Sequence, residues 1–258
     1  MKGLYAVYRK EMAHYFVSPI AYIVVGVFLF VAGFFFTRIF VFLVEQAFEM
    51  GMNQFGGGID VPSLLVRDFF GILSSLFLFV TPMLTMGVYA EERKRGTMEL
   101  LMTSPVTDTE IVLGKYLALM TLFIIMLLPT MIYSAIVLGH SDPAAPWRIL
   151  WCAYLGALLL GGVLLALGSF FSSLTENQLI AAVLTFGACL ILWVIDFGSR
   201  GASSGFGAAI QYLSVIKHYD DFTRGVIDTS SLIYYVSFIF LGLFLTVRSI
   251  DSMRWRRA

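Results

Sequence analysis

Long, uninterrupted runs of apolar residues dominate the chain and are separated by short polar segments. Six such runs cover residues of about 20–44, 69–90, 116–138, 149–174, 179–195 and 232–247. Crossing the hydrocarbon core of a bilayer takes about 20 apolar residues in a helix. Because lipid offers no partners for backbone N–H and C=O groups, these runs must be helical. The pattern predicts an all-α polytopic membrane protein with six transmembrane helices.

Composition narrows the classes of function. Of the 258 residues, 59% are hydrophobic and 13% are charged, whereas an ordinary soluble domain has about 25% charged residues. This composition excludes a disordered chain, a disulfide scaffold and a nucleic-acid-binding protein. The six runs leave no segment long enough for a second domain of ~100–150 residues. We therefore expect residues 1–258 to form a single membrane domain.

The distribution of Lys and Arg predicts the orientation. If both termini are cytoplasmic, 11 of the 17 Lys and Arg residues lie inside and 5 lie outside. Positive residues accumulate in cytoplasmic loops, so we expect both termini in the cytoplasm. The remaining Arg38 lies near the outer end of the first run, and its side chain is expected to snorkel to the headgroups.

Residues 1–19 predict an amphipathic interfacial helix. At 100° per residue, one arc of about 120° holds the apolar and aromatic side chains, namely Leu4, Tyr5, Tyr8, Met12, Tyr15 and Phe16. The charged side chains, including Arg9, Lys10 and Glu11, lie outside that arc. Such a helix rests on the inner membrane surface, with its basic side chains towards the lipid phosphates. It is either a simple anchor or a lever that packs against a cytoplasmic partner.

The segment between the second and third runs predicts a charged helical hairpin. The second span is expected to continue into the cytosol through residues 91–95, whose cations suit the negative end of a helix. Gly96 follows at the position just after a helix end, where a residue with a left-handed backbone conformation is favoured. Thr97 is expected to cap a short helix over residues 98–103, which Pro105 brings to an end.

The hairpin is closed by a capping box and carries an apolar elbow. Thr107 and Glu110 have the spacing of a capping box before the third run. Leu100, Leu101 and Met102 form the elbow and have no obvious core to enter. The elbow is therefore either a docking surface for another protein or part of a loop that only sets the topology.

Two features inside the spans are candidates for motion and packing. Pro82 and Pro129 lie within the second and third runs, where each removes a backbone donor and favours a kink, so both are candidate hinges. The fourth run carries small residues four positions apart, in the pairs Ala157/Gly161 and Gly162/Ala166. Such pairs let helices approach closely, either within the chain or across a dimer face.

Together, these segments resemble the ABC-2 type transporter permease family. The series Glu-Glu-Arg-x-x-Gly-Thr-x-Glu-Leu-Leu at 91–101, followed by Ser-Pro at 104–105 and Leu-Gly-Lys at 113–115, is similar to the family's cytoplasmic coupling element. Residues 9–19, with Arg-Lys-Glu at 9–11, Tyr-Phe at 15–16 and Ser-Pro at 18–19, resemble its interfacial helix. Residues 217–228 resemble the outer segment before the last span. The branch that looks most similar contains the permeases of gliding motility and of nitrous-oxide reductase maturation.

The resemblance implies a permease subunit in the plasma (inner) membrane of a prokaryote. A separate ATPase subunit would bind ATP and Mg, and a second permease copy, identical or related, would complete the pathway. A periplasmic accessory protein is a further candidate partner. The resemblance assigns contact with the ATPase to Glu91, Glu92, Arg93, Gly96, Thr97, Glu99, Leu100, Leu101 and Pro105. It assigns the interfacial helix to Arg9, Lys10, Glu11 and Tyr15.

The chain carries no phosphate-binding loop of its own. That loop needs the pattern GxxxxGK[ST], but before Gly114-Lys115 the first glycine position is Thr109, and the next residue is Tyr116. We therefore expect a protein that is not an enzyme, binds no cofactor or metal, and exports an unidentified cargo. Two alternatives remain open: an ATP-independent channel or carrier, and a structural subunit that transmits ATPase motion to a periplasmic protein.

Overall fold

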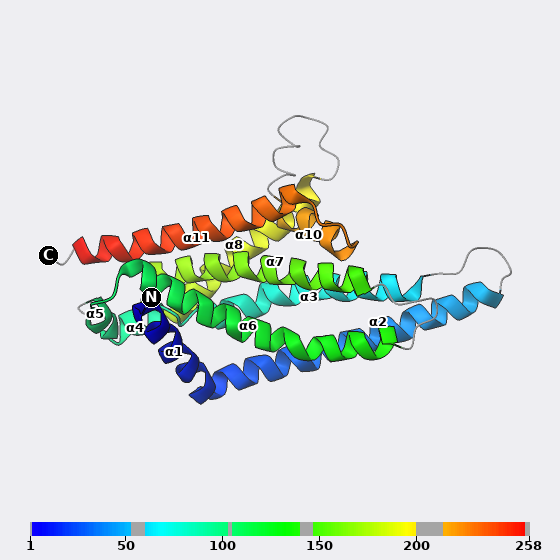
Figure 1. Cartoon of the computed structure of the whole chain (residues 1–258), viewed down its shortest axis with the longest axis horizontal. Coiled ribbons are helices and arrows are strands. Elements are labelled where there is room, and N and C mark those ends of the chain that lie inside the picture. The colour runs from blue at the N-terminus through cyan, green and yellow to red at the C-terminus, as the bar shows by residue number, and fades with distance from the viewer. Residues whose placement is uncertain (1, 53–59, 103–104, 140–146, 200–213, 256–258) are drawn as a thin grey trace.

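The computed structural model is an elongated bundle of helices (Figure 1). It describes residues 2–52, 60–102, 105–139, 147–199 and 214–255. The helices are α1 Lys2–Val17, α2 Pro19–Met52, α3 Val61–Thr85, α4 Ala90–Lys94, α5 Thr97–Met102, α6 Asp108–Gly139, α7 Trp147–Leu174, α8 Gln178–Ser199, α10 Val215–Thr223 and α11 Thr229–Trp255. α1, α4 and α5 lie at one end of the bundle, here named the α4–α5 end, and α10 lies towards the other (Figure 1).

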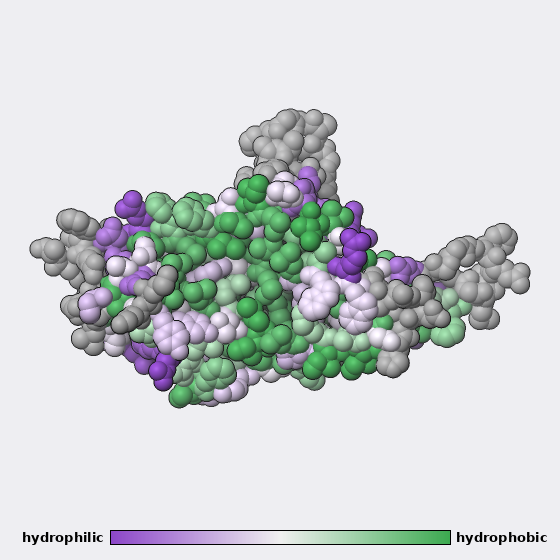
Figure 2. All heavy atoms as spheres, viewed as in Figure 1, coloured by the Kyte–Doolittle hydropathy of each residue, from purple (hydrophilic) through white to green (hydrophobic). Residues whose placement is uncertain are grey.

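Within the described residues, six helical segments are long and apolar enough to cross a membrane. They are α2, α3 with α4, α6, α7, α8 and α11. Hydrophobic residues cover the middle of the visible face, and hydrophilic residues gather towards its two ends (Figure 2). This distribution matches a bilayer around the middle of the bundle, and the prediction of an all-α protein with six spans is confirmed.

The first two spans are longer than the sequence predicts. The apolar runs predict spans over about 20–44 and 69–90, but α2 continues to Met52 and α3 already begins at Val61. Asp60 caps α3 by accepting a hydrogen bond from the Ser63 backbone N–H at 3.3 Å, and Pro62 suits the first turn. The cap at Asp60 thus lets α3 begin within a segment that is polar by its hydropathy.

Helix α7 is the centre of the bundle and packs against α3, α6, α8, α10 and α11. Its glycines allow this close packing. A Cβ on Gly161 would lie 2.3 Å from the Phe123 ring, and one on Gly168 would lie 2.3 Å from Thr85 Oγ1. A Cβ on Gly156 would lie 2.6 Å from Phe222. The small residues of this span therefore pack against neighbours in the same chain, one of the two predicted arrangements.

Helix α10 dips into the bundle before the last span. Its residues Val215, His218, Tyr219 and Phe222 are buried. The Tyr219 hydroxyl donates to the Phe70 carbonyl at 3.0 Å, and the Tyr235 hydroxyl donates to the Val215 carbonyl at 2.9 Å. These hydrogen bonds fix α10 within the bundle, beside α3 and α11.

Candidate functional site

The helix breaks where the second span reaches the α4–α5 end. The sequence predicts that the second span continues through residues 91–95, and the span does extend to Lys94, but its helix is interrupted: α3 ends at Thr85 and α4 begins at Ala90. In the turn between them, the Val88 N–H donates to the Thr85 carbonyl at 3.2 Å. In an unbroken helix, the Thr85 carbonyl would instead accept from the Tyr89 N–H. The helical hydrogen bonds of α3 therefore stop three residues after Pro82.

Ser172 of α7 satisfies the backbone groups that the break exposes. Its hydroxyl oxygen accepts from the Tyr89 N–H at 3.1 Å and from the Ala90 N–H at 3.3 Å. The same hydroxyl donates to the Met86 carbonyl at 3.1 Å. Because Tyr89, Ala90 and Ser172 are buried and Met86 is partly buried, Ser172 replaces the partners that water would otherwise supply. One side chain therefore fixes the angle between α3 and α4.

We expect Ser172→Ala to lower the free energy of unfolding by about 1–2 kcal/mol, since it leaves buried backbone groups without partners. The control is Ser169→Ala, one turn earlier on α7. Ser169 is also buried, but its hydroxyl donates only to the Leu165 carbonyl of its own helix, at 2.8 Å. Thermal unfolding in detergent measures both variants, and equal losses would contradict the role assigned to Ser172.

Helices α4 and α5 form the charged hairpin, and several of its contacts are local. Gly96 has a φ of +71°, as its predicted left-handed position requires. Glu91 pairs with Arg95 one turn later. Instead of capping α5, the Thr97 hydroxyl donates to the Glu92 carbonyl at 3.3 Å. Arg93 ties the hairpin to the end of α7 by donating to the Ser173 carbonyl at 2.7 Å.

The hairpin's elbow is partly packed against the core. Met98 is buried, and Leu101 is partly buried against the hydrophobic core. The expectation that the elbow has no core to enter is therefore wrong for Leu101. Of the other predicted coupling residues, Glu99 and Pro105 are exposed, and the side chain of Leu100 lies outside the described residues.

The predicted capping box forms at the start of α6. The Glu110 N–H donates to the Thr107 hydroxyl at 3.4 Å, and the Thr107 N–H donates to the Glu110 carboxylate at 3.3 Å. This reciprocal pair fixes where the third span begins and confirms the prediction made from the spacing.

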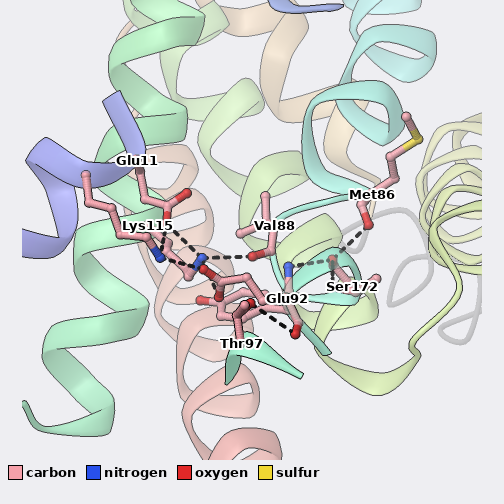
Figure 3. A network of polar contacts seen from close by, with 10 residues as sticks. Glu11, Met86, Val88, Glu92, Thr97, Lys115 and Ser172 are labelled. Carbon is pink, nitrogen blue, oxygen red and sulfur yellow. Dashed lines mark hydrogen bonds and ion pairs between the residues drawn. The ribbon is translucent and has the colours of Figure 1, made fainter. Parts of the chain in front are cut away.

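Lys115 joins the predicted interfacial helix to the predicted coupling hairpin (Figure 3). Its side chain is 1% exposed. Its ammonium group lies 3.0 Å from Glu11 Oε1 of α1 and 2.9 Å from Glu92 Oε2 of α4. It also donates to the Val88 carbonyl at 2.9 Å. One buried side chain on α6 thus contacts α1, the turn after α3 and α4.

Lys10 completes the cluster. Its ammonium group donates to Glu92 Oε1 at 2.8 Å and lies 3.7 Å from Glu11 Oε1. Lys10, Glu11, Glu92 and Lys115, here named the Lys115 cluster, hold two cations and two anions. Since burial of an unpaired charge is costly, this balance is what permits ionised groups at a buried position.

The predicted orientation of α1 is wrong for two of its charged residues. Glu11 was placed on the polar face of a surface helix, but it is buried against α6. Lys10 was directed to lipid phosphates and instead pairs with Glu92. Burial lowers the pKa of Lys10, but the hydrogen bond and charge of Glu92, with the charge of Glu11, raise it above its ordinary value. Lys10 therefore remains charged in the cluster.

A cavity of about 770 Å³ adjoins the Lys115 cluster, between α1, the start of α2 and the α3–α5 segment. Burial, followed by the charges of Glu11 and Glu92, raises the pKa of Tyr15 well above its ordinary value. The buried Tyr15 hydroxyl lacks a hydrogen-bond partner in the described part of the chain. Across the described ranges, no three His, Cys, Asp or Glu side chains come together as they would around a metal ion.

Sequence reasoning missed Lys115 and Ser172 as parts of this site. Lys115 was counted only as one of the inside charges and as the last residue of the Leu-Gly-Lys series. A signal was present, since a lysine at the start of a long apolar run needs an acidic partner. Ser172 carries no comparable signal, because buried serines commonly bond their own helix, as Ser169 does.

Among the described residues, six helical segments of membrane-spanning length define a multi-pass membrane protein. Residues 49–216 match the model of the family described as ABC-2 family transporter protein. The match covers more than half of the chain, and the chain belongs to the ABC-2 transporter family. The predicted family is thus confirmed, while the predicted branch stays a prediction.

Two curated relatives match part of the chain. They are the probable multidrug ABC transporter permease YbhS of Escherichia coli (strain K12) and the protein of the same name from Escherichia coli O157:H7. Each is 30% identical over 123 residues, which cover 47% of this chain and 31% of the relative. The alignment thus spans about a third of the length of these relatives.

Proposed function

We propose that this chain is the membrane permease subunit of an ATP-driven exporter and that α4–α5 docks a separate ATPase subunit. The observation that carries the proposal is the Lys115 cluster, which ties the hairpin to α1 and α6. A surface that receives force from a partner must be connected rigidly to the spans that move. In this proposal, the ATPase supplies ATP and Mg binding, and this chain is not an enzyme.

The orientation proposed from the Lys and Arg distribution places the α4–α5 end in the cytoplasm. Both ends of the chain would then lie on that side of the plasma (inner) membrane of a prokaryote. Figure 1 supports this arrangement, because the N-terminal helix α1 and the end of α11 lie towards the same end as the hairpin. A soluble ATPase could therefore reach α1 and α4–α5 together.

We propose that closure of the ATPase moves α4 and α1 as one unit. Lys115 passes that motion to α6, and Ser172 and Arg93 pass it to α7. Pro82 and Pro129 lie inside α3 and α6 and are the proposed hinges. The pathway would form between two permease copies, whether identical or related.

The cargo proposed for this exporter is apolar. The relatives' printed name refers to multidrug transport, and the polar groups within the spans are mainly hydroxyls that bond carbonyls of their own helices, as do Thr85, Thr185 and Thr246. A coupling-ion pathway would need ionisable side chains in the spans. An accessory protein on the α10 side is a further proposed partner.

Charge reversal on the hairpin surface tests the docking of the ATPase. Lys94 and Arg95 are exposed, whereas Glu92 is largely withdrawn into the Lys115 cluster. We expect Lys94→Glu/Arg95→Glu to lower ATPase recovery roughly tenfold in an affinity purification from mild detergent, because like charges would then face the partner. Mass spectrometry and an ATPase assay measure the recovery.

The matched control is Lys217→Glu/Arg224→Glu, which reverses two exposed charges on and beside α10. We expect this variant to retain the ATPase. Equal recovery with both variants would reject the docking surface. If the stable wild-type chain bound no ATPase at all, an ATP-independent channel or carrier would replace the proposal.

A further inference from the structure

A second cavity lies on the flank of the bundle, far from the Lys115 cluster. It is a groove of about 630 Å³ between α2, α3 and α10. Its charged lining consists of Arg38, Arg67, Asp68 and Asp220, and its apolar lining includes Ile39 and Ile72. Two cations and two anions therefore share one groove with hydrophobic side chains.

Three of these four charges have no partner within the part of the chain that the structure describes. Arg38, Arg67 and Asp68 are exposed. Among the residues that the structure describes, none of the three has an ion pair or hydrogen bond from its charged group. Asp220 is partly exposed and lies 3.6 Å from Arg224. Charged side chains that are unpaired in a groove can bind the charged groups of a ligand.

The depth of the two arginines matches the headgroup level. At 1.5 Å per residue, Arg38 lies about 28 Å along α2 from Pro19, and Arg67 lies about 27 Å along α3 from Thr85. The hydrocarbon core is about 30 Å thick. Measured from the α4–α5 end, both guanidinium groups thus reach the headgroups of the opposite leaflet, while the isoleucines border the acyl chains.

We infer that this groove binds a phospholipid with a zwitterionic phosphoethanolamine headgroup in the leaflet on the α10 side. Arg38 and Arg67 bind the phosphate, because guanidinium groups match phosphate oxygens. Asp68 and Asp220 accept hydrogen bonds from the ammonium group. The inference rests on the six-span fold and stands apart from the proposed function.

The two carboxylates select the headgroup. A phosphoglycerol headgroup would bind the arginines through its phosphate, but it places neutral hydroxyls rather than a cation beside Asp68 and Asp220, so no positive charge offsets the two carboxylates. A phosphocholine headgroup carries a cation whose methyl groups replace the N–H donors that carboxylates prefer. Phosphoethanolamine alone among these three supplies an anion and hydrogen-bonding ammonium together.

Gly71 leaves the space that the lipid occupies. A Cβ built on Gly71 meets no atom within 4 Å, although the residue lines the groove. A larger side chain at this position would therefore fill the groove without disturbing the packing of α3. Gly26 on α2 is also exposed and also meets no atom within 4 Å, but it does not line the groove.

Lipid retention measured by native mass spectrometry tests the inference. The full chain is reconstituted in vesicles of equimolar phosphatidylethanolamine, phosphatidylglycerol and phosphatidylcholine with identical acyl chains, then released into mild detergent. We expect the wild type to retain phosphatidylethanolamine in preference to the other two lipids. Arg38→Ala/Arg67→Ala and Gly71→Leu are each expected to reduce its retention on the order of tenfold. Gly26→Leu should retain it like the wild type.

Two further experiments test which part of the lipid headgroup is recognised. Asp68→Asn should reduce the preference for phosphatidylethanolamine over phosphatidylglycerol. Soluble phosphoethanolamine should not displace the lipid, because it lacks the acyl chains. Any one of four results would overturn the inference. They are equal retention of all three lipids by the wild type, a wild-type preference for phosphatidylglycerol, displacement of the lipid by soluble phosphoethanolamine, and unchanged retention in Gly71→Leu. An unchanged melting temperature shows that a variant is folded.

Discussion

Lys115→Ala is expected to lower the free energy of unfolding by about 3–5 kcal/mol, the cost of breaking a buried ion pair by removing one partner. The substitution leaves the Glu11 carboxylate buried with only the more distant Lys10 ammonium at 3.7 Å. It also removes one of the two cations that contact Glu92. Thermal or denaturant unfolding in detergent measures the loss.

Two variants separate this electrostatic cost from the loss of packing. Lys94→Ala removes an exposed lysine near the cluster and is expected to change stability by less than about 0.5 kcal/mol. Glu11→Gln/Lys115→Met removes one charge of each sign and leaves the Lys10–Glu92 pair at 2.8 Å intact. We expect this double variant to be more stable than Lys115→Ala. If it is no more stable, lost packing rather than an unpaired carboxylate explains the effect.

Gly168→Val is expected to cost about 3 kcal/mol or more in the free energy of unfolding, because overpacking a well-packed core forces neighbours to move. A Cβ at Gly168 would lie 2.3 Å from Thr85 Oγ1, 2.7 Å from its Cβ and 2.8 Å from its Cγ2. A short threonine side chain cannot swing away as a long one can. The clash lies at the last residue of α3, next to the break that Ser172 supports.

The control for this clash is Gly26→Val on α2, where a Cβ meets no atom within 4 Å. Both variants place the same β-branched residue in a membrane-length helix, so they share its intrinsic helix propensity. Only Gly168→Val should lower the melting temperature strongly. Similar losses at the two positions would show that propensity, rather than the contact with Thr85, limits stability.

Features set by local interactions were predictable from the sequence. The six spans follow from hydropathy, because the length of an apolar helix is fixed by the bilayer. Gly96 and the pair Thr107 and Glu110 were predictable because each acts within one helical turn. The family could also be identified, since its motif is carried by contiguous residues.

Features set by distant partners were not predictable in the same way. The arc of apolar residues on α1 indicates a membrane surface, but the helix packs against α6, where Glu11 pairs with Lys115 and the buried Val7 packs against Gly114. The break after Thr85 depends on Ser172, 83 residues away from its partner Tyr89. Nothing local to either segment specifies these encounters, so only the three-dimensional structure provides them.

The separation between Glu11 and Lys115 also sets an order of events during biosynthesis. Glu11 leaves the ribosome 104 residues before its lysine, which takes about 5–20 s at typical rates of synthesis. Throughout that interval, α1 has no buried cation to receive its carboxylate. The N-terminal helix therefore docks only after the first two of the six spans have been synthesised and the third has begun, so its docking reports that these first spans are in place.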